Sequence, residues 1–371
     1  WYVHDMDGLC FMTHMTKILY GVQGTGNGHI TRARIMATAF AQRDDVHVDY
    51  LFSGRDIDKY FDMEVFGHYQ TRRGLSFSTK NGSINVLNTV RQNSLIQCWK
   101  DIRDLNVSEY DVVINDFEPI TAWAAKLSSV PCINISHQAA FACPIPQASK
   151  TLIDRAILHS FAPSNIRLGV HWYHFGQHIL PPFIKQHHQN SATLSEHILV
   201  YLPFESINEI KECIEPLSEQ SFIVFHPDIK HSHTINNVQY RSPGYSEFQS
   251  ALHQCVGVIA NGGFELSSEA LVLGKKLLLK PLAGQFEQSS NIMTLQSLGL
   301  CEFMPFLSSE FIDDWLETQG NSPIHFPDQS SVLVDWILQK QWDKPQTLCD
   351  KLWQNVHFPQ NVSERLTTLS R

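Results

Sequence analysis

Residues 17–41 read KILYGVQGTGNGHITRARIMATAFA, and this stretch decides the fold. The apolar run Lys17–Gln23 predicts a buried strand, and the Ala- and Arg-rich run His29–Ala41 predicts a helix. A glycine-rich turn joins the two, and a second apolar strand is predicted at Val46–Phe52. Strands that alternate with helices in this way predict a parallel sheet with helices on both faces.

The alternation continues along the chain and restarts after the polar segment 185–195. A chain of 371 residues is long enough for two domains. We therefore predict an α/β fold of two doubly wound, Rossmann-like parallel-sheet domains that face a cleft. The predicted parts are an extension at 1–14, a first domain at 15–184, a linker at 185–195, a second domain at 196–345 and a helical tail at 346–371.

The individual elements follow from the same patterns. A long helix is predicted at 85–105, a helix with proline in its first turn at 119–128, and a strand at 166–175, where apolar and polar residues alternate. The other predicted strands are 110–115, 131–136, 197–203, 221–226, 238–241, 256–260 and 276–281.

The composition is that of an ordinary globular protein, with 43% hydrophobic and 18% charged residues. A net charge of -9 is the opposite of the positive charge typical of proteins that bind nucleic acid. We expect at most peripheral contact with a membrane. The eight cysteines show no paired CxxC spacing, which predicts reduced thiols in a cytoplasmic protein. No apolar run approaches the roughly 20 residues that a membrane helix needs.

The turn Gly24-Thr25-Gly26-Asn27-Gly28-His29 departs from the dinucleotide-binding pattern in its spacing, which disfavours a nicotinamide cofactor. His29 begins the helix, and Asp116 ends a strand at the same edge of the sheet. Imidazole exchanges protons near neutral pH, and a neighbouring carboxylate orients it and stabilises its cation. We predict that His29 and Asp116 form a catalytic pair. The alternative is that His29 caps the turn, while Asp116 and Glu118 stabilise a helix N-terminus.

A second glycine turn, Asn261-Gly262-Gly263, also lies between a predicted strand and a predicted helix. Backbone amides at the positive end of that helix suit a diphosphate. Glu269, two turns into the helix, is placed to accept hydrogen bonds from a ribose. Gln285, Glu287 and Gln288 follow the next strand and supply donors and acceptors for sugar hydroxyls. A polar helix cap is the alternative role for each of these side chains.

The run from Asn261 to Gly299, with its glycine pair and its Glu287-Gln288, resembles the donor-site signature of two-domain nucleotide-sugar glycosyltransferases of the GT-B fold. These include the lipid II N-acetylglucosaminyltransferase and the UDP-glucuronosyl and UDP-glucosyl transferases. The loop Gly24–His29 resembles the N-terminal loop and histidine of that superfamily. Together with the segment Asp116-Phe117-Glu118-Pro119, it resembles a prokaryotic branch. The resemblance extends from Lys17 to about Phe303.

The resemblance implies an inverting hexosyltransferase that moves a sugar from a nucleoside-diphosphate sugar, expected to be UDP-linked, to an acceptor hydroxyl of a glycan or lipid. His29 would be the general base and Asp116 its partner, with no metal and no cofactor besides the donor substrate. Recognition of the base is expected around Arg241–Tyr245, and contact with the acceptor at His137, for which a structural role is the alternative. The expected donor-binding residues are Gly26, Asn27, Gly28, Arg241, Gly262, Gly263, Glu269, Gln285, Glu287 and Gln288.

Two other functions share this architecture, a sugar-nucleotide 2-epimerase and a non-catalytic sensor of sugar nucleotides. His171, His174 and His178 suggest a metal site, but the predicted strand sends His171 and His174 to opposite sides, so we predict none. Aromatic residues around Trp172 and Phe183 could face a membrane or fill a core between the domains, and we favour the core.

Overall fold

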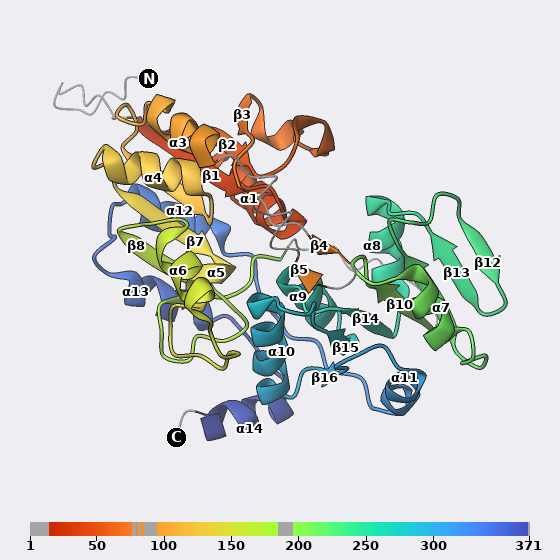
Figure 1. The fold of residues 1–371 in the computed structure, drawn as a ribbon. Helices are drawn as coiled ribbons and strands as arrows, with labels where there is room; N and C mark the ends of the chain where they lie inside the picture. The colour runs from red at the N-terminus through yellow and green to blue at the C-terminus, as the bar shows by residue number, and fades with distance from the viewer. Residues whose placement is uncertain (1–14, 76–78, 81–82, 85–94, 185–195, 370–371) are drawn as a thin grey trace.

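The computed structural model describes residues 15–75, 79–80, 83–84, 95–184 and 196–369. It contains two seven-stranded sheets, each covered by helices (Figure 1). The strand orders are β3-β2-β1-β6-β7-β8-β9 and β12-β13-β11-β10-β14-β15-β16. The pairs within both sheets are parallel apart from β12 with β13. The predicted α/β arrangement of two doubly wound sheets is confirmed.

The first domain is built around β1, an apolar strand that is almost entirely buried. Its strands are β1 (Thr16–Gln23), β2 (Val46–Ser53), β3 (Tyr69–Arg72), β6 (Val112–Asp116), β7 (Cys132–Ser136), β8 (Ile166–Val170) and β9 (Ile179–Leu180), with a separate pair β4 (Thr79–Lys80) and β5 (Ser83–Ile84). Its helices are α1 (Asn27–Phe40), α3 (Leu95–Asp104), α4 (Pro119–Leu127), α5 (His137–Ala140) and α6 (Leu152–Ser160), with short 3₁₀ turns η1 (Ile57–Lys59) and η2 (Glu64–Phe66).

The second domain repeats the pattern around β10 and β14, whose apolar runs lie at the centre of its sheet. Its strands are β10 (His197–Tyr201), β11 (Ser221–Phe225), β12 (His233–Ile235), β13 (Val238–Arg241), β14 (Gly257–Asn261), β15 (Lys276–Lys280) and β16 (Glu302–Phe303). Its helices are α7 (Ile207–Ile214), α8 (Tyr245–Gln254), α9 (Phe264–Val272), α10 (Phe286–Leu298) and α11 (Ser309–Leu316). Helices α12 (Ser330–Leu338), α13 (Pro345–Trp353) and α14 (Gln360–Leu369) complete the described chain.

Two predicted elements need correction. The predicted strand at 166–175 is wrong beyond Val170, where β8 ends, and Phe175 has a φ of 49°, which a strand does not allow. The chain turns there and returns as β9, which pairs with β8. Of the predicted helix at 85–105, the structure shows α3 from Leu95, and residues 85–94 lie outside the described residues. The predicted extension 1–14 and linker 185–195 also lie outside them.

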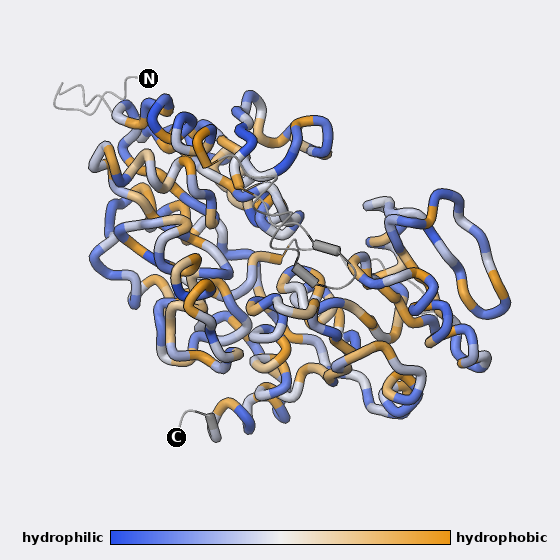
Figure 2. Tube along the Cα trace, in the orientation of Figure 1, coloured by the Kyte–Doolittle hydropathy of each residue, from blue (hydrophilic) through white to orange (hydrophobic). Residues whose placement is uncertain are grey.

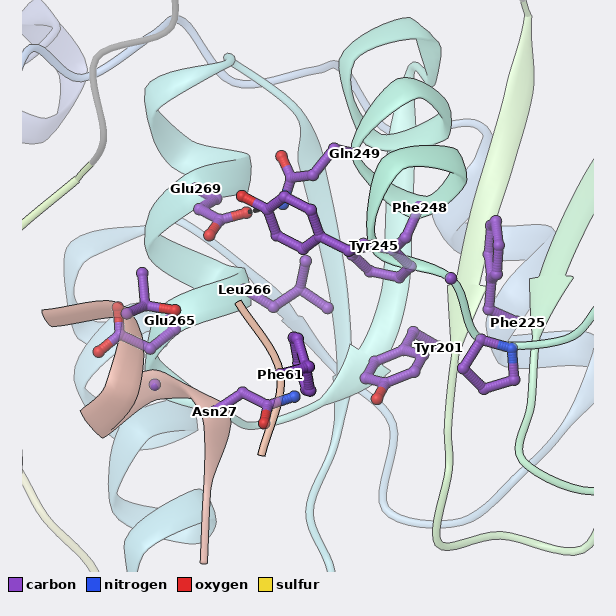
Figure 3. Close-up of a pocket in the computed structure, with 14 residues that line it drawn as sticks. Asn27, Phe61, Tyr201, Phe225, Tyr245, Phe248, Gln249, Glu265, Leu266 and Glu269 are labelled. Carbon is purple, nitrogen blue, oxygen red and sulfur yellow. Dashed lines mark hydrogen bonds between the residues drawn. The ribbon is translucent and has the colours of Figure 1, made fainter. Parts of the chain in front are cut away.

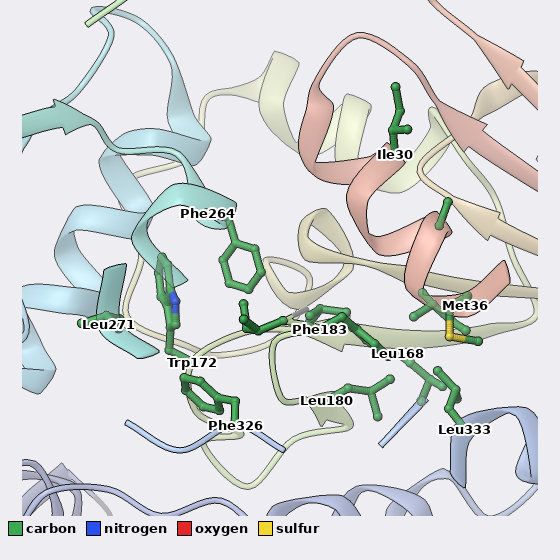
Figure 4. Packing of buried hydrophobic residues seen from close by; sticks show 14 of the residues in the cluster. Ile30, Met36, Leu168, Trp172, Leu180, Phe183, Phe264, Leu271, Phe326 and Leu333 are labelled. Carbon is green, nitrogen blue, oxygen red and sulfur yellow. The ribbon is translucent and has the colours of Figure 1, made fainter. Parts of the chain in front are cut away.

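One hydrophobic core runs through both domains (Figure 4). Hydrophobic segments fill the interior of the molecule and hydrophilic segments occupy most outer loops (Figure 2). Trp172 of the first domain is fully buried, packs on Phe264 of the second, and donates from Nε1 to Ser268 Oγ at 2.8 Å. Phe183 is buried in the same cluster. The burial of Trp172 and Phe183 supports the interpretation of these aromatic residues as an interdomain core.

Helices α12 and α13 return to the first domain. Helix α12 lies within the range predicted for the second domain, but it packs against α1, and α13 packs against β9. Met36 of α1 and Leu333 of α12 lie in the shared core (Figure 4). Helix α14 packs against α10 of the second domain, so the last three helices contact both domains.

Candidate active site

Two glycine turns bring the first turns of α1 and α9 together at the carboxyl ends of their sheets. Gly26 precedes α1 and Gly263 precedes α9, and neither helix receives a hydrogen bond from a capping side chain. Gly28, in the first turn of α1, lies against Glu265 in the first turn of α9, and a Cβ atom on Gly28 would overlap Glu265 Cγ. Only glycine permits this contact between the domains without displacing Glu265.

The structure brings His29 and Asp116 together. Strand β6 pairs with β1 in the register Val22↔Asp116, so Asp116 ends its strand beside the turn that leads to His29. The His29 Nδ1 atom lies 2.8 Å from Asp116 Oδ1. Asp116 is fully buried, while 11% of the His29 side chain is exposed. Because the carboxylate accepts from Nδ1, Nε2 is the ring atom left to accept a proton.

Arg32 is a third member of this group, and the sequence analysis missed it. It lies one turn after His29 on α1 and is 2% exposed. Its Nε donates to Asp116 Oδ2 at 2.7 Å, its Nη2 donates to Asp116 Oδ1 at 3.1 Å, and its Nη1 donates to Glu265 Oε1 at 2.8 Å. One guanidinium therefore joins the partner of His29 to the second domain. The i, i+3 spacing of His29 and Arg32 is the only local signal of this arrangement.

The two carboxylates that share Arg32 differ in acidity. Burial alone would raise the pKa of Asp116, but the charges of Arg32 and His29 outweigh it and lower that pKa. Burial raises the pKa of Glu265 to about 8, although Arg32 opposes the change. Asp116 is therefore the permanent anion beside His29, and Glu265 is the carboxylate that takes up a proton first.

Asp116 and Glu118, two positions apart, have different contacts. Glu118 caps α4, because Oε1 accepts from the Ile120 amide at 2.8 Å and Oε2 accepts from the Thr121 amide at 2.7 Å. Phe117 between the two acids has a φ of 52°, an uncommon conformation for a residue other than glycine. The helix-capping alternative thus describes Glu118, while Asp116 contacts His29 and Arg32.

A cavity of about 470 Å³, here called the His29 cavity, lies beside this group. Gln285 and Glu287 of the second domain line it together with His29 and Gly26. Its other lining residues are Gln23, Thr25, Phe117, Gln138, Phe141, Asp154, Ile157, Leu158, Phe161, Phe204, Gly284 and Phe286.

Gln288 does not line the His29 cavity. It is 6% exposed, and its Oε1 accepts from the Leu282 amide at 2.7 Å, so it braces the turn before α10. His137, predicted to contact the acceptor, does not line this cavity either. It is 2% exposed, with Nδ1 donating to the Val170 carbonyl at 2.8 Å and Nε2 lying 2.7 Å from Asn291 Oδ1. The neighbouring Gln138 occupies the cavity wall instead.

A second cavity of about 400 Å³, here called the aromatic cavity, lies on the other side of the glycine turn (Figure 3). Asn27 and Gly28 line its edge. Glu269 lines it as well and accepts from Gln249 Nε2 at 3.0 Å. Its aromatic walls are Tyr201, Phe225, Tyr245 and Phe248 of the second domain and Phe61 of the first.

Three other predicted donor residues, Arg241, Gly262 and Gly263, line neither cavity. Arg241 donates from Nη2 to Gln239 Oε1 at 2.7 Å, and its guanidinium lies 5.9 Å from the Phe225 ring centroid. The Gly262 carbonyl accepts from Asn291 Nδ2 at 2.9 Å. Gly263, at the N-terminus of α9, has open space where a Cβ would lie. The predicted base-recognition segment still contributes Pro243, Gly244 and Tyr245 to the aromatic cavity.

The described part of the chain contains no group of three or more His, Cys, Asp or Glu residues placed to hold a metal ion. His171 is buried, and its Nε2 lies 3.2 Å from Thr294 Oγ1. A search of the described helices for one that is long and apolar enough to cross a bilayer finds none.

Comparison with known proteins gives the family. The profile of glycosyl transferase family 1 matches residues 16–318. The glycosyltransferase of kitacinnamycin is similar at a TM-score of 0.56 and 12% identity, covering 95% of this chain and 98% of that one. SnogD from Streptomyces nogalater reaches 0.53 at 12% identity, and Phytolacca americana UGT2 reaches 0.53 at 10%, each with 96% of this chain and 99% of the other covered. A search of curated proteins finds no match.

At these identities the structural likeness shows the fold, and the profile, which covers most of the chain, shows the family. The two parallel-sheet, Rossmann-like domains agree with the GT-B fold of these structures. The chain belongs to glycosyl transferase family 1 and is a glycosyltransferase with the GT-B fold.

Proposed function

We propose that the protein transfers a sugar from a UDP-linked donor to an acceptor hydroxyl with inversion at the anomeric carbon, and that His29 is the general base. The observation that carries this proposal is the 2.8 Å contact between His29 Nδ1 and the buried Asp116, on the wall of a cavity that both domains line. His29 Nε2 has no hydrogen-bond partner among the described residues, so it is available to accept the hydroxyl proton.

In the proposed step the acceptor oxygen attacks the anomeric carbon and forms the new glycosidic bond. The bond from that carbon to the diphosphate oxygen breaks on the opposite face, and its electron pair leaves with the nucleoside diphosphate. The hydroxyl proton passes to His29 Nε2, and Asp116 stabilises the imidazolium. The first-turn amides of α9, after Gly263, are the proposed site for the departing negative charge.

The donor is proposed to span both cavities. Its base would stack on aromatic rings such as Tyr201 and Phe248, and its ribose would contact Glu269. Its sugar would enter the His29 cavity, where Gln285 and Glu287 lie. Support for UDP comes from a relative of the same fold, Phytolacca americana UGT2, whose structure contains UDP-2-fluoro-glucose. We propose that the charge of the diphosphate is met by helix amides and that no metal is required.

The test uses slow donor hydrolysis, in which water replaces the acceptor. His29→Ala should lower the hydrolysis rate of UDP-glucose by about 100-fold or more and leave UDP binding nearly unchanged, because general-base catalysis contributes on this scale. His47→Ala, an exposed histidine paired with Asp49, is the matched control and should behave like the parent. Full hydrolysis by His29→Ala would remove His29 as the base. Analysis of the recovered donor by NMR separates hydrolysis from 2-epimerisation, and addition of EDTA tests independence from metals.

A further inference from the structure

The aromatic cavity, proposed above to hold the base and ribose of the donor, is acidic on the side formed by α9. Its lining contains two carboxylates, Glu265 and Glu269 (Figure 3), and among the described residues that line it there is no Lys, Arg or His. Glu265 and Glu269 lie four positions apart on α9, so they share one face of the helix. A nucleoside diphosphate therefore brings further negative charge to a wall that already holds two acidic side chains.

Glu265 lies in the turn that is proposed to meet the diphosphate. It is the second residue of α9, and the first-turn amides of this helix are the proposed site for the departing negative charge. Its Oε1 accepts from Arg32 Nη1 at 2.8 Å, and its Oε2 has no hydrogen-bond partner among the described residues. The Glu265 side chain is 18% exposed and lines the aromatic cavity. Oε2 is therefore the atom of this carboxylate that is left to contact a ligand.

The cation paired with Glu265 is already shared. Arg32 is 2% exposed, and it also donates to both carboxylate oxygens of Asp116. One guanidinium thus serves two carboxylates. Arg55 contacts the glycine turn by donating to Asn27 Oδ1 at 3.0 Å, but it does not line the aromatic cavity. A further anion beside Glu265 is therefore best accommodated if this carboxylate becomes neutral.

The surroundings of Glu265 favour its neutral form. Burial raises the pKa of Glu265 to about 8; Arg32 opposes this change, whereas the charges of Glu269 and Asp116 add to it. Burial also raises the pKa of Glu269, and the hydrogen bond from Gln249 opposes that change. The phenols in the cavity lining, whose pKa values burial raises, belong to Tyr201 and Tyr245. A negative charge that arrives beside Glu265 would raise its pKa again.

We propose that binding of the donor diphosphate is coupled to the uptake of one proton by Glu265, and that the resulting carboxyl group donates a hydrogen bond from Oε2 to a phosphate oxygen. This inference rests on the proposed function, since it concerns the diphosphate of the same donor. The proton comes from solvent and binds to Oε2, and no other covalent bond forms or breaks. Oε1 continues to accept from Arg32, so the contact between the domains is kept. Repulsion between two anions is replaced by a charge-assisted hydrogen bond.

The experiment measures binding of UDP to the full chain by calorimetry between pH 7 and pH 9. With a pKa of about 8, only about a tenth of Glu265 is protonated at pH 9, so UDP should bind about tenfold more weakly at pH 9 than at pH 7. Titrations at pH 8 in HEPES and in Tris, two buffers that differ in ionisation enthalpy, should show uptake of about half a proton for each UDP bound.

Variants identify the group that takes up the proton. Glu265→Gln replaces the protonated carboxyl by an amide, which carries no charge and still donates. This variant should bind UDP about tenfold more tightly than the parent at pH 9, without proton uptake. Glu247→Gln is the matched control, because Glu247 lies in the first turn of α8 and is exposed outside the cavity lining. It should keep the pH dependence of the parent. His29→Ala should keep it as well, because the proton is assigned to Glu265 and not to the imidazole.

The outcomes separate the two proposals. UDP that binds equally well at pH 7 and pH 9, without proton uptake, overturns the inference about Glu265 and leaves the proposed function intact. Proton uptake that persists in a folded Glu265→Gln protein, or that disappears in His29→Ala, also overturns it. The measurements on the parent and on His29→Ala remain decisive if Glu265→Gln folds poorly. Failure of UDP to bind at any of these pH values contradicts the proposed function, and the inference falls with it.

Discussion

Replacing Arg32 by Met should destabilise the protein by about 3–5 kcal/mol, because it leaves the buried carboxylate of Asp116 and the partly buried carboxylate of Glu265 without their shared cation. Met keeps the length and apolar contacts of the side chain, so most of the loss is electrostatic. A loss of this size is a large fraction of the 5–15 kcal/mol that ordinarily stabilises a folded protein. The free energy of unfolding is measured by urea titration of both proteins at the same pH.

The chain contains a matched control for this experiment. Arg43 is held in the same way, with Nε and Nη2 donating to Asp45 at 2.9 and 2.8 Å and Nη1 donating to Asp335 at 2.7 Å. Arg43 is 37% exposed, however, whereas Arg32 is 2% exposed. Exposed ion pairs contribute about 0.2–1 kcal/mol, so Arg43→Met should cost far less than Arg32→Met. The difference between the two variants isolates the effect of burial.

The pH dependence supplies a second criterion. Without Arg32, the pKa of Asp116 rises from its lowered value and the pKa of Glu265 rises further above its unfolded value, because burial opposes both charges and the cation that offset it is gone. Stability associated with a raised carboxyl pKa is present at low pH and is lost as pH rises through the folded pKa. The deficit of Arg32→Met should therefore be larger at pH 8 than at pH 5. A deficit that is the same at both pH values, or no larger than that of Arg43→Met, would refute this reasoning.

Three further results are expected. Gly28→Ala should lower donor turnover by about tenfold or more, because its Cβ would overlap Glu265, whereas Gly320→Ala should be tolerated, since nothing lies within 4 Å of the position of its Cβ; donor hydrolysis assays compare them. Glu118→Ala should lower the free energy of unfolding by about 1–2 kcal/mol through loss of the α4 cap, and an unchanged urea midpoint would contradict that role. Burial raises the pKa of Cys132 to about 12, so this thiol should resist alkylation at pH 8 until the protein unfolds, as mass spectrometry can show.

The pairing of His29 with Asp116 could be predicted from the sequence because it depends on one sheet. Both residues end or follow apolar strands, and parallel strands present their carboxyl ends at one edge. The contact of Arg32 with Glu265 could not be predicted in this way. The two residues lie 233 positions apart on separate domains, and their meeting depends on how the domains pack.

The errors in the prediction also have physical causes. The alternating residues after Val170 resemble a strand, but β8 ends at Val170 and the chain turns at Phe175 and Gly176, both with positive φ, before β9. His137 and Gln138 begin helix α5, where one step along the chain turns the side-chain direction by about 100°. His137 is buried, as its structural alternative predicts, and Gln138 lines the His29 cavity, while an acceptor contact at His137 stays a prediction.

The return of α12 to the first domain determines the order in which this protein can be completed on the ribosome. The part of α1 that packs against α12 stays uncovered until residues 330–338 have emerged, after the whole second sheet has been synthesised, whereas β1 and η2 of the first domain cover the rest. Domains of larger proteins usually fold in the order of their synthesis. Here the second sheet is synthesised before Leu333 and the rest of α12 are available to pack on the first domain. A nascent chain stopped before α12 would therefore expose the apolar surface of α1 that α12 covers.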